Sequence, residues 1–337
     1  MSFDAIPGQT KVTEFLKQGI RQRRTAHAYC FAGPRGVGRY RTALELAKAL
    51  NCDAAREDAC DRCRNCIRIE NGNHPDVWII EPDGQSIKID QVRGLQRAFH
   101  YTTSENTTRV MIIQQAETMT VQAANSLLKF LEEPITPMVA VLITEHVHSL
   151  LPTVLSRCQV LRFAPLAADW IAQKLEGEGF NTAEAWVAAH IAPGLDEARE
   201  IASIDGFALL CERVIQWSGE IVSGKSDALL SVQTKWIHKE LDKERLELVL
   251  DLMLLWLRDL LNQKLKRTVP PVFLKWEDSC RRQAPRWSTS RLLHGMETVI
   301  DARRQLAGPV QPQAVLEFMV LAMQGGATNV QSRRRSF

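Results

Sequence analysis

The sequence of 337 residues has no long apolar run and no large excess of one charge. Its most apolar stretch, residues 252–257, is bounded by Asp251 and Arg258 and is far shorter than the roughly 18 residues that a membrane span needs. The net charge of +3 neither demands nor excludes nucleic acid. Residues 1–7 carry no basic segment followed by an apolar one, so no signal peptide is expected. We therefore expect a soluble, cytoplasmic protein of two or three domains with no membrane partner.

A glycine-rich loop lacks the residues that bind phosphate and metal in ATPases. Residues 33–40 keep the glycine spacing, but Arg39 replaces the phosphate-binding lysine, and Tyr40 replaces the short hydroxyl that holds Mg²⁺. An apolar segment at 27–32 precedes the loop and a helical pattern follows it, as in a nucleotide-binding fold. The sequence predicts a loop with weak or no nucleotide binding. Its candidate contacts are Gly33, Gly36, Gly38 and Arg39.

The acidic pair of an ATPase is missing as well. A metal-binding acid and a water-activating acid are expected after the strand predicted at residues 110–113. Gln114 and Gln115 stand there instead. Amides neither balance a divalent cation nor accept a proton from water. Together with Arg39 and Tyr40, they predict that the chain does not hydrolyse ATP.

Eight cysteines are present, and four of them cluster with seven, two and two residues between them. Without an export signal, such a cluster favours a metal over disulfides. Four thiolates suit a tetrahedral structural Zn²⁺ with no open position. An iron–sulfur cluster and unligated thiols remain as alternatives. The proposed zinc ligands are Cys52, Cys60, Cys63 and Cys66. The isolated cysteines, which are expected to pack as small hydrophobic side chains, are Cys30, Cys158, Cys211 and Cys280.

Short apolar segments alternate with helical patterns in the first half of the chain. This alternation predicts an α/β domain with a parallel sheet. One helix is well marked, because Thr120 can cap it and residues 132–134 end it. The predicted strands are 27–32, 77–80, 110–113, 139–144 and 159–163. A last apolar stripe is expected at Val315, Phe318, Met319 and Ala322.

These motifs together resemble the bacterial DNA polymerase III clamp-loader family, an AAA+ assembly, and especially its delta prime type from Gram-positive bacteria. The resemblance covers roughly residues 15–165, and the C-terminal half matches only in size and pattern. The segments that carry it, besides the four cysteines, are 26–29, 33–40, 50–52, 72–76, 124–129, 131–134 and 156–158.

The resemblance implies three domains and a set of partners. The partners would be gamma- or tau-type ATPase subunits and the delta subunit, with the sliding clamp and primer–template DNA met through the assembled ring. ATP would be bound only in the partner subunit, and the chain would act at the replisome as a component of the polymerase holoenzyme. The implied parts are an AAA+ parallel-sheet domain at 1–165 with a zinc module at about 52–66, a helical lid at 166–208, an all-α collar that joins subunits at 209–326, and a disordered basic tail at 327–337.

The resemblance also implies a role for Arg157, which lies between Ser156 and Cys158. In the family, this arginine reaches ATP bound by the neighbouring subunit. A forked, permanently charged guanidinium suits the charge that builds on the γ-phosphate. Asp196 aligns with a phosphate-sensing arginine of the ATPase subunits, and an acid there would repel a triphosphate. Thr144 matches a polar sensor position.

The function we expect is an ATPase-inactive subunit that completes the clamp-loading ring and lends Arg157 to its neighbour. A first alternative is a gamma-like subunit with weak nucleotide binding, because Arg39 keeps a positive charge. A second is a zinc-dependent nucleic-acid-binding protein. The cysteine segment lacks interleaved aromatic residues, however, so base stacking is poorly supported.

Overall fold

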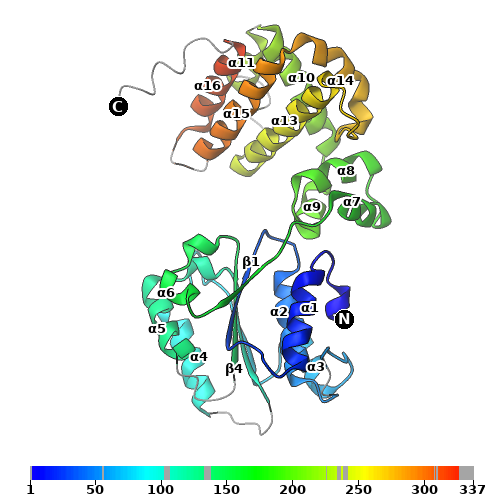
Figure 1. Ribbon diagram of the computed structural model, residues 1–337. Helices are drawn as coiled ribbons and strands as arrows, with labels where there is room; N and C mark the ends of the chain where they lie inside the picture. The colour runs from blue at the N-terminus through cyan, green and yellow to red at the C-terminus, as the bar shows by residue number, and fades with distance from the viewer. Residues whose placement is uncertain are drawn as a thin grey trace. The chain divides into compact units, whose positions relative to one another are not determined.

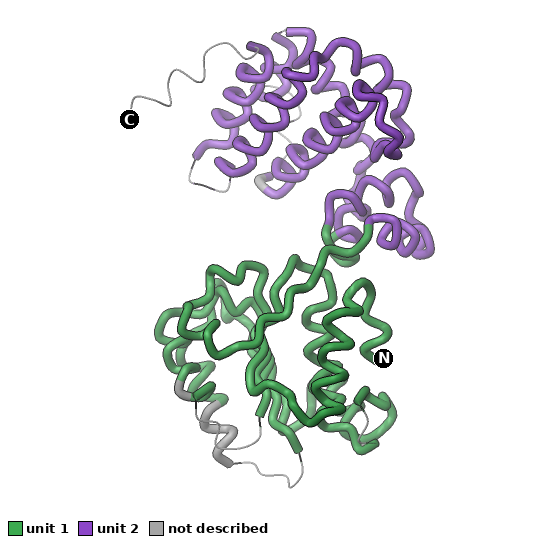
Figure 2. Tube along the Cα trace, in the orientation of Figure 1, with its two compact units in different colours: residues 1–167, 193–197 green, residues 168–192, 198–337 purple. Residues whose placement is uncertain are grey.

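The structure is a computed structural model, and the chain forms two compact units (Figure 2). The first comprises residues 1–167 and 193–197, and the second comprises residues 168–192 and 198–337. Within the described ranges, no helix is both long and apolar enough to cross a membrane. The described residues are 2–54, 57–101, 107–132, 138–224, 226–233, 237, 242–306, 308 and 310–325.

Five parallel strands form the centre of the first unit, in the order β2-β3-β4-β1-β5 (Figure 1). Each lies within one residue of the bounds predicted from the sequence, so the predicted parallel sheet is confirmed. β1, β3 and β4 are buried along their whole length, because helices cover both faces of the sheet. The strands are β1 (Ala28–Ala32), β2 (Val77–Ile80), β3 (Arg109–Ile113), β4 (Met138–Thr144) and β5 (Gln159–Arg162).

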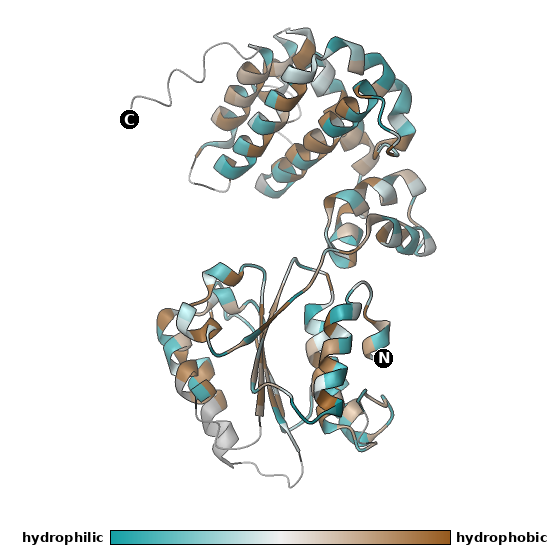
Figure 3. Ribbon diagram, in the orientation of Figure 1, coloured by the Kyte–Doolittle hydropathy of each residue, from teal (hydrophilic) through white to brown (hydrophobic). Residues whose placement is uncertain are grey.

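Alternate side chains of β1 divide between two apolar layers, one on each face of the sheet. Tyr29 and Phe31 pack with α1 and α2, whereas Cys30 and Ala32 belong to the layer covered by α4, α5 and α6. The strands are drawn largely in hydrophobic colours in Figure 3. The bounds are α1 (Thr10–Arg21), α2 (Arg39–Asn51), α3 (Arg64–Glu70), α4 (Ile89–Tyr101), α5 (Val121–Glu132) and α6 (Pro152–Leu155), with 3-10 turns η1 (Phe3–Ala5), η2 (Ala116–Thr118) and η3 (Val147–Ser149).

The beginnings of α2 and α5 follow from local chemistry. Gly38 precedes α2 with a φ of 92°, which is a left-handed conformation that favours glycine. Thr120 precedes α5, and its Oγ1 accepts a hydrogen bond from the Ala123 N–H at 3.3 Å. This contact confirms the predicted cap and satisfies one of the free amides of the first turn.

The rest of the described chain is helical. The apolar run at 252–257 lies within α13, where Met253, Trp256 and Leu257 are fully buried, so this run is part of a packed helix. The helices are α7 (Ala168–Gly177), α8 (Thr182–Ile191), α9 (Leu195–Ala202), α10 (Phe207–Ser223), α11 (Asp227–Gln233), α13 (Lys243–Lys264), α14 (Glu277–Gln283), α15 (Thr289–Leu306) and α16 (Pro312–Gln324), with η4 (Leu274–Trp276) and η5 (Ala284–Arg286).

Three details qualify the expectations for this half. α10 begins at Phe207, two residues before the predicted start of the collar, and the domain boundaries stay a prediction. Phe318, predicted on the buried stripe of the last helix, is 60% exposed. The reason is that Val315 and Met319 define the buried face of α16, and Phe318 lies about 100° around the helix from Met319. The predicted tail at 327–337 lies outside the described residues.

Candidate functional site

The glycine loop lies between β1 and α2, as predicted, and the segment at 193–197 packs directly on it. A Cβ built on Gly194 would lie 2.4 Å from the carbonyl carbon of Gly36, so the two backbones touch. A Cβ on Gly36 would lie 3.6 Å from the backbone nitrogen of Asp196. The structure thus brings the backbone of Asp196 beside the loop. Its alignment with the sensing arginine of the ATPases stays a prediction.

Arg39 is buried and turned toward an acid of its own chain. Its Nη2 lies 3.5 Å from Oε1 of Glu145, the residue that directly follows β4. Burial lowers the pKa of Arg39, and the nearby carboxylates of Glu145 and Glu117 act in the opposite direction. The cation that replaces the phosphate-binding lysine is therefore already paired.

Glu117 completes this arrangement. Its Oε1 accepts a hydrogen bond from the Glu145 N–H at 3.2 Å. Its Oε2 is buried and has no hydrogen-bond partner among the described residues. Sequence reasoning missed both glutamates. Their position in the sequence could have identified them as candidate site residues, because each follows the carboxyl end of a parallel strand, where ligand sites of α/β folds lie.

The two glutamines after β3 do not form a metal site. Gln114 Nε2 donates to Oε1 of Glu81 at 2.5 Å, and Glu81 directly follows β2. Gln115 is exposed, with a left-handed φ of 47°. Tyr40 is half-buried against the apolar layer of α1 and α2, and burial raises the pKa of its phenol. Acidic residues thus follow the carboxyl ends of three neighbouring strands: Glu81 follows β2, Glu117 follows β3 and Glu145 follows β4. Their negative charge opposes the binding of a triphosphate.

Thr144, the predicted sensor, is held within the fold. It is 1% exposed, and its Oγ1 accepts a hydrogen bond from the His146 N–H at 3.1 Å. Its carbonyl oxygen accepts from the Gly33 N–H at 3.2 Å. Thr144 thus ties β4 to the start of the glycine loop.

The four clustered cysteines converge as predicted. Their sulfur atoms all lie within 4.8 Å of one another. The Cys66 N–H donates to Sγ of Cys63 at 3.4 Å, a contact made within one chelate turn. Backbone N–H groups of Arg62 and Cys63 lower the pKa of Cys60 to about 6, while burial raises the pKa of Cys66.

The donor set fits a tetrahedral metal. Four thiolates this close repel one another unless a cation lies between them, and two of the sulfurs belong to the buried residues Cys52 and Cys66. The arrangement can hold a metal ion. No further cysteine joins the cluster, and no fifth ligand from His, Asp or Glu is grouped with it in the described part of the chain.

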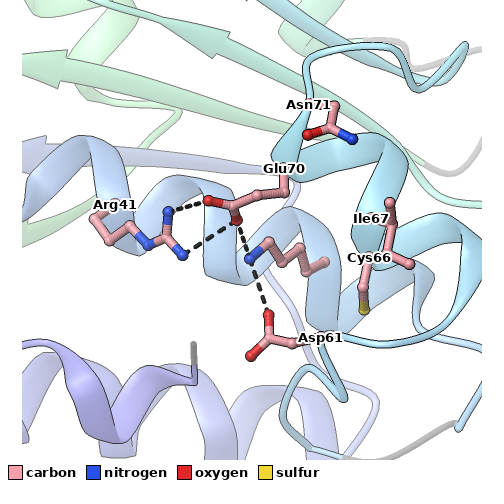
Figure 4. Close-up of a pocket in the computed structure, with 7 residues that line it drawn as sticks. Arg41, Asp61, Cys66, Ile67, Glu70 and Asn71 are labelled. Carbon is pink, nitrogen blue, oxygen red and sulfur yellow. Dashed lines mark hydrogen bonds and ion pairs between the residues drawn. The ribbon is translucent and has the colours of Figure 1, made fainter.

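An ionic network joins this cysteine module to α2 (Figure 4). Lys48 is 1% exposed, and its Nζ lies 3.1 Å from Glu45 Oε1, 3.0 Å from Asp61 Oδ1 and in direct contact with Glu70. Arg41 binds Glu70 through both terminal nitrogens, at 2.6 and 3.1 Å. The network borders a cavity of about 240 Å³ lined by Arg41, Lys48, Asp61, Cys66, Ile67, Glu70 and Asn71.

Arg157 lies just after α6, and its side chain is 35% exposed. Its exposure is only partial, because its Nη2 lies 2.5 Å from Oε1 of Glu132. Glu132 ends α5, as the sequence predicted for that helix. The two residues that follow it in the family motif, at 133–134, lie outside the described residues.

The parallel sheet in the order β2-β3-β4-β1-β5, the glycine loop before α2, the inserted module of four cysteines and the helical C-terminal half define an AAA+ protein. A family model described as "DNA polymerase III, delta subunit" matches residues 8–167. The chain is 36% identical over 318 residues to DNA polymerase III subunit delta' of Bacillus subtilis, which covers 94% of this chain and 97% of that protein. The chain belongs to the family of DNA polymerase III delta prime subunits.

Other curated relatives match a smaller share of the chain. DNA polymerase III subunit tau of Bacillus subtilis is 33% identical over 68% of this chain and 40% of its own length. The delta' subunit of Pseudomonas aeruginosa is 38% identical over 45% of this chain and 49% of its own length. Among solved structures, the match to a gamma-subunit-related protein of Thermotoga maritima spans 93% of this chain and 99% of that protein. The two are 18% identical, with a TM-score of 0.41.

Proposed function

We propose that this chain is the ATPase-inactive subunit of a replicative clamp loader. It completes the ring that loads the sliding clamp onto primed DNA, and it supplies Arg157 in trans to ATP bound by a gamma- or tau-type neighbour. Membership of the delta prime family supports the clamp-loader role. The partners are then the ATPase subunits and the delta subunit directly, and the clamp and primer–template DNA through the ring, in the cytoplasm at the replisome.

One contrast between two arginines carries the proposal. Arg39, in the phosphate-binding position of its own loop, is buried and paired with Glu145. Arg157 sits at the end of a short surface helix, where over a third of its side chain reaches solvent. Each arginine is paired with a glutamate, so the contrast lies in burial. A guanidinium enclosed in its own domain cannot reach another chain, whereas a partly exposed one can reach a phosphate bound there.

The loss of ATP hydrolysis follows from three other residues. Tyr40, Gln114 and Gln115 leave Mg²⁺ without the hydroxyl, the acid and the base of an ATPase. The gamma-like alternative relied on the positive charge of Arg39. The pair with Glu145 weighs against that alternative.

The remaining parts have supporting roles in this proposal. The four cysteines hold a structural zinc ion, which stabilises the module without taking part in chemistry. Residues 166–208 form the lid and residues 209–326 form the collar that joins the subunits.

The test is a clamp loader reconstituted with the Arg157→Ala variant. This chain should fold and assemble normally, because Arg157 lies at the surface. DNA- and clamp-stimulated ATP turnover by the complex should fall in part, since only one of its ATP sites meets Arg157, and clamp loading should fall further. Trans arginine fingers contribute up to ~10³–10⁵ in rate where they have been measured.

Two variants sharpen the result. Arg157→Lys should rescue poorly, because a point charge does not reproduce the planar fork. Arg64→Ala removes an exposed arginine at the start of α3 and should leave turnover unchanged. If the Arg157→Ala complex assembles and loads clamps at the wild-type rate, the trans role of Arg157 is wrong.

A further inference from the structure

The guanidinium of Arg157 is held by three acceptors from two helix ends. Its Nη1 donates to the carbonyl oxygen of Thr153 at 2.8 Å and to Oγ of Ser156 at 3.2 Å. Its Nη2 lies 2.5 Å from Oε1 of Glu132. Thr153 belongs to α6, and Glu132 is the last residue of α5. The side chain therefore has a defined orientation before any partner is present.

The position of Glu132 is unfavourable for α5 by itself. The last turn of a helix carries partial negative charge, so an acid there is destabilising. The pair with Arg157 at best cancels this cost, because ion pairs between partly exposed side chains contribute little to stability, and Glu132 and Arg157 are 47% and 35% exposed. Stability alone therefore does not account for a glutamate at this position.

The donor count of Arg157 leaves room for a phosphate. A guanidinium has five N–H donors. The contacts to Thr153, Ser156 and Glu132 use three of them within the described part of the chain. The two that remain are the number that a bidentate contact to a phosphate needs. A phosphate can thus bind without first displacing the carboxylate.

We propose that Glu132 is a positioning residue for Arg157. It fixes the guanidinium at the end of α6, so that the free edge of the fork meets the phosphate of the neighbouring subunit in one orientation. The proposal rests on the trans role of Arg157 proposed above. Its physical basis is that a freely rotating arginine must be ordered at the moment of reaction, whereas one held in place has already lost that freedom.

The test is Glu132→Gln in the reconstituted complex with its ATPase subunits, clamp and primed DNA. Glutamine keeps the size of the side chain and removes the charge at the helix end, so the melting temperature of this chain should not fall. The turnover that depends on Arg157, measured as wild type minus Arg157→Ala, should drop about threefold or more, since small misplacements of reacting groups are costly. KM for ATP should stay unchanged, because orientation acts on the reaction step.

Further variants separate positioning from a general surface effect. Glu132→Asp should recover part of the lost turnover, because it restores the carboxylate on a shorter stem. In an Arg157→Ala background, Glu132→Gln should change nothing further. Glu14→Gln alters an exposed glutamate of α1 and should behave as wild type.

The outcomes are distinguishable. If Arg157→Ala has no effect, the proposed function fails and Glu132 has no role to play. If Arg157→Ala lowers turnover and Glu132→Gln does not, the arginine acts without a positioning residue and this inference alone is overturned. If Glu132→Gln raises turnover, Glu132 restrains Arg157, and positioning is equally refuted.

Discussion

Lys48 Nζ lies 3.0 Å from Oδ1 of Asp61, so the helix that follows the glycine loop directly holds the chelate turn of the cysteine module. Asp61 has a left-handed φ of 56° and lies between Cys60 and Cys63. The same ammonium contacts Glu45, which is fully buried on α2. Lys48 thus joins a buried acid of the core helix to the exposed side of the module.

Lys48→Met should destabilise the protein strongly. Methionine has a similar shape, but it leaves Glu45 buried with Arg41 as its only cationic partner, at 2.8 Å, among the residues that the structure describes. Removing one member of a buried ion pair typically costs about 3–5 kcal/mol, and the remaining contact with Arg41 favours the lower end. Urea unfolding should therefore show a loss of about 3 kcal/mol. The exposed Lys88→Met should stay within about 0.5 kcal/mol. A loss below about 1 kcal/mol for Lys48→Met would mean that the network has no structural role.

Glu70→Gln should lower stability in a pH-dependent way. Hydrogen bonds from Arg41 and Lys48 lower the pKa of Glu70 to about 2, against about 4.3 in an unfolded chain. The stabilisation is therefore fully present above the unfolded pKa and is lost as the pH falls from about 4.3 to about 2. Because the side chain is 42% exposed, solvent limits its size to about 1 kcal/mol at pH 7.

The measurement is the difference in unfolding free energy between wild type and Glu70→Gln, followed from pH 7 to pH 3. Acid also protonates the cysteine ligands, but that loss affects both proteins alike and cancels in the difference. The difference should shrink as the pH falls. If it stays constant, the charge of Glu70 does not stabilise the fold.

The cysteine module should contain about one zinc ion per chain in a colourless protein. Cys63→Ser should lose the metal and lower the melting temperature, since a closed structural site contributes folding free energy. Metal analysis and thermal unfolding check both expectations. Cys158→Ser, outside the cluster, should keep its zinc. Brown protein with iron–sulfur absorption would instead support the iron–sulfur alternative.

The sheet could be predicted from the sequence because its signals are local. A short apolar run such as 110–113 is buried on both faces and is bounded by polar residues, which marks a strand without knowledge of its neighbours. The cysteine cluster could be predicted equally well, because the short spacing between its cysteines is the spacing that lets them bind one metal ion together. Phe318 was misassigned because a helical stripe is defined by the partner helices that cover it, which the sequence does not contain.

The ion pairs could not be predicted in this way. Glu132 ends α5 and Arg157 follows α6, whereas Arg39 begins α2 and Glu145 follows β4. Such pairs depend on how the sheet orders its strands, and glutamates are common enough that none stands out alone. Ligand sites of α/β folds lie at the carboxyl ends of parallel strands. Glu145 and Glu117 both follow such strand ends, so this general rule would have marked them as candidate site residues.

The purified chain should show no Mg²⁺-dependent ATP turnover above that of its Arg39→Ala variant. Tyr40 and Gln114 give the metal no ligand, and Gln115 gives water no base. Glu145→Gln removes the partner of Arg39, so it should strengthen any weak ATP binding while turnover stays absent. Fluorescent-nucleotide titration and phosphate release measure the two properties separately.

The gamma-like alternative would be favoured if the wild-type chain binds ATP saturably, if Arg39→Ala loses this binding, and if Glu145→Gln leaves it unchanged. It would mean that Arg39 leaves Glu145 for the phosphate at little cost, despite burial and the 3.5 Å contact. Magnesium-dependent turnover by the pure chain would refute the inactive subunit altogether. We expect neither, because the acids after β2, β3 and β4 face any triphosphate with negative charge, and one buried, paired guanidinium does not outweigh them.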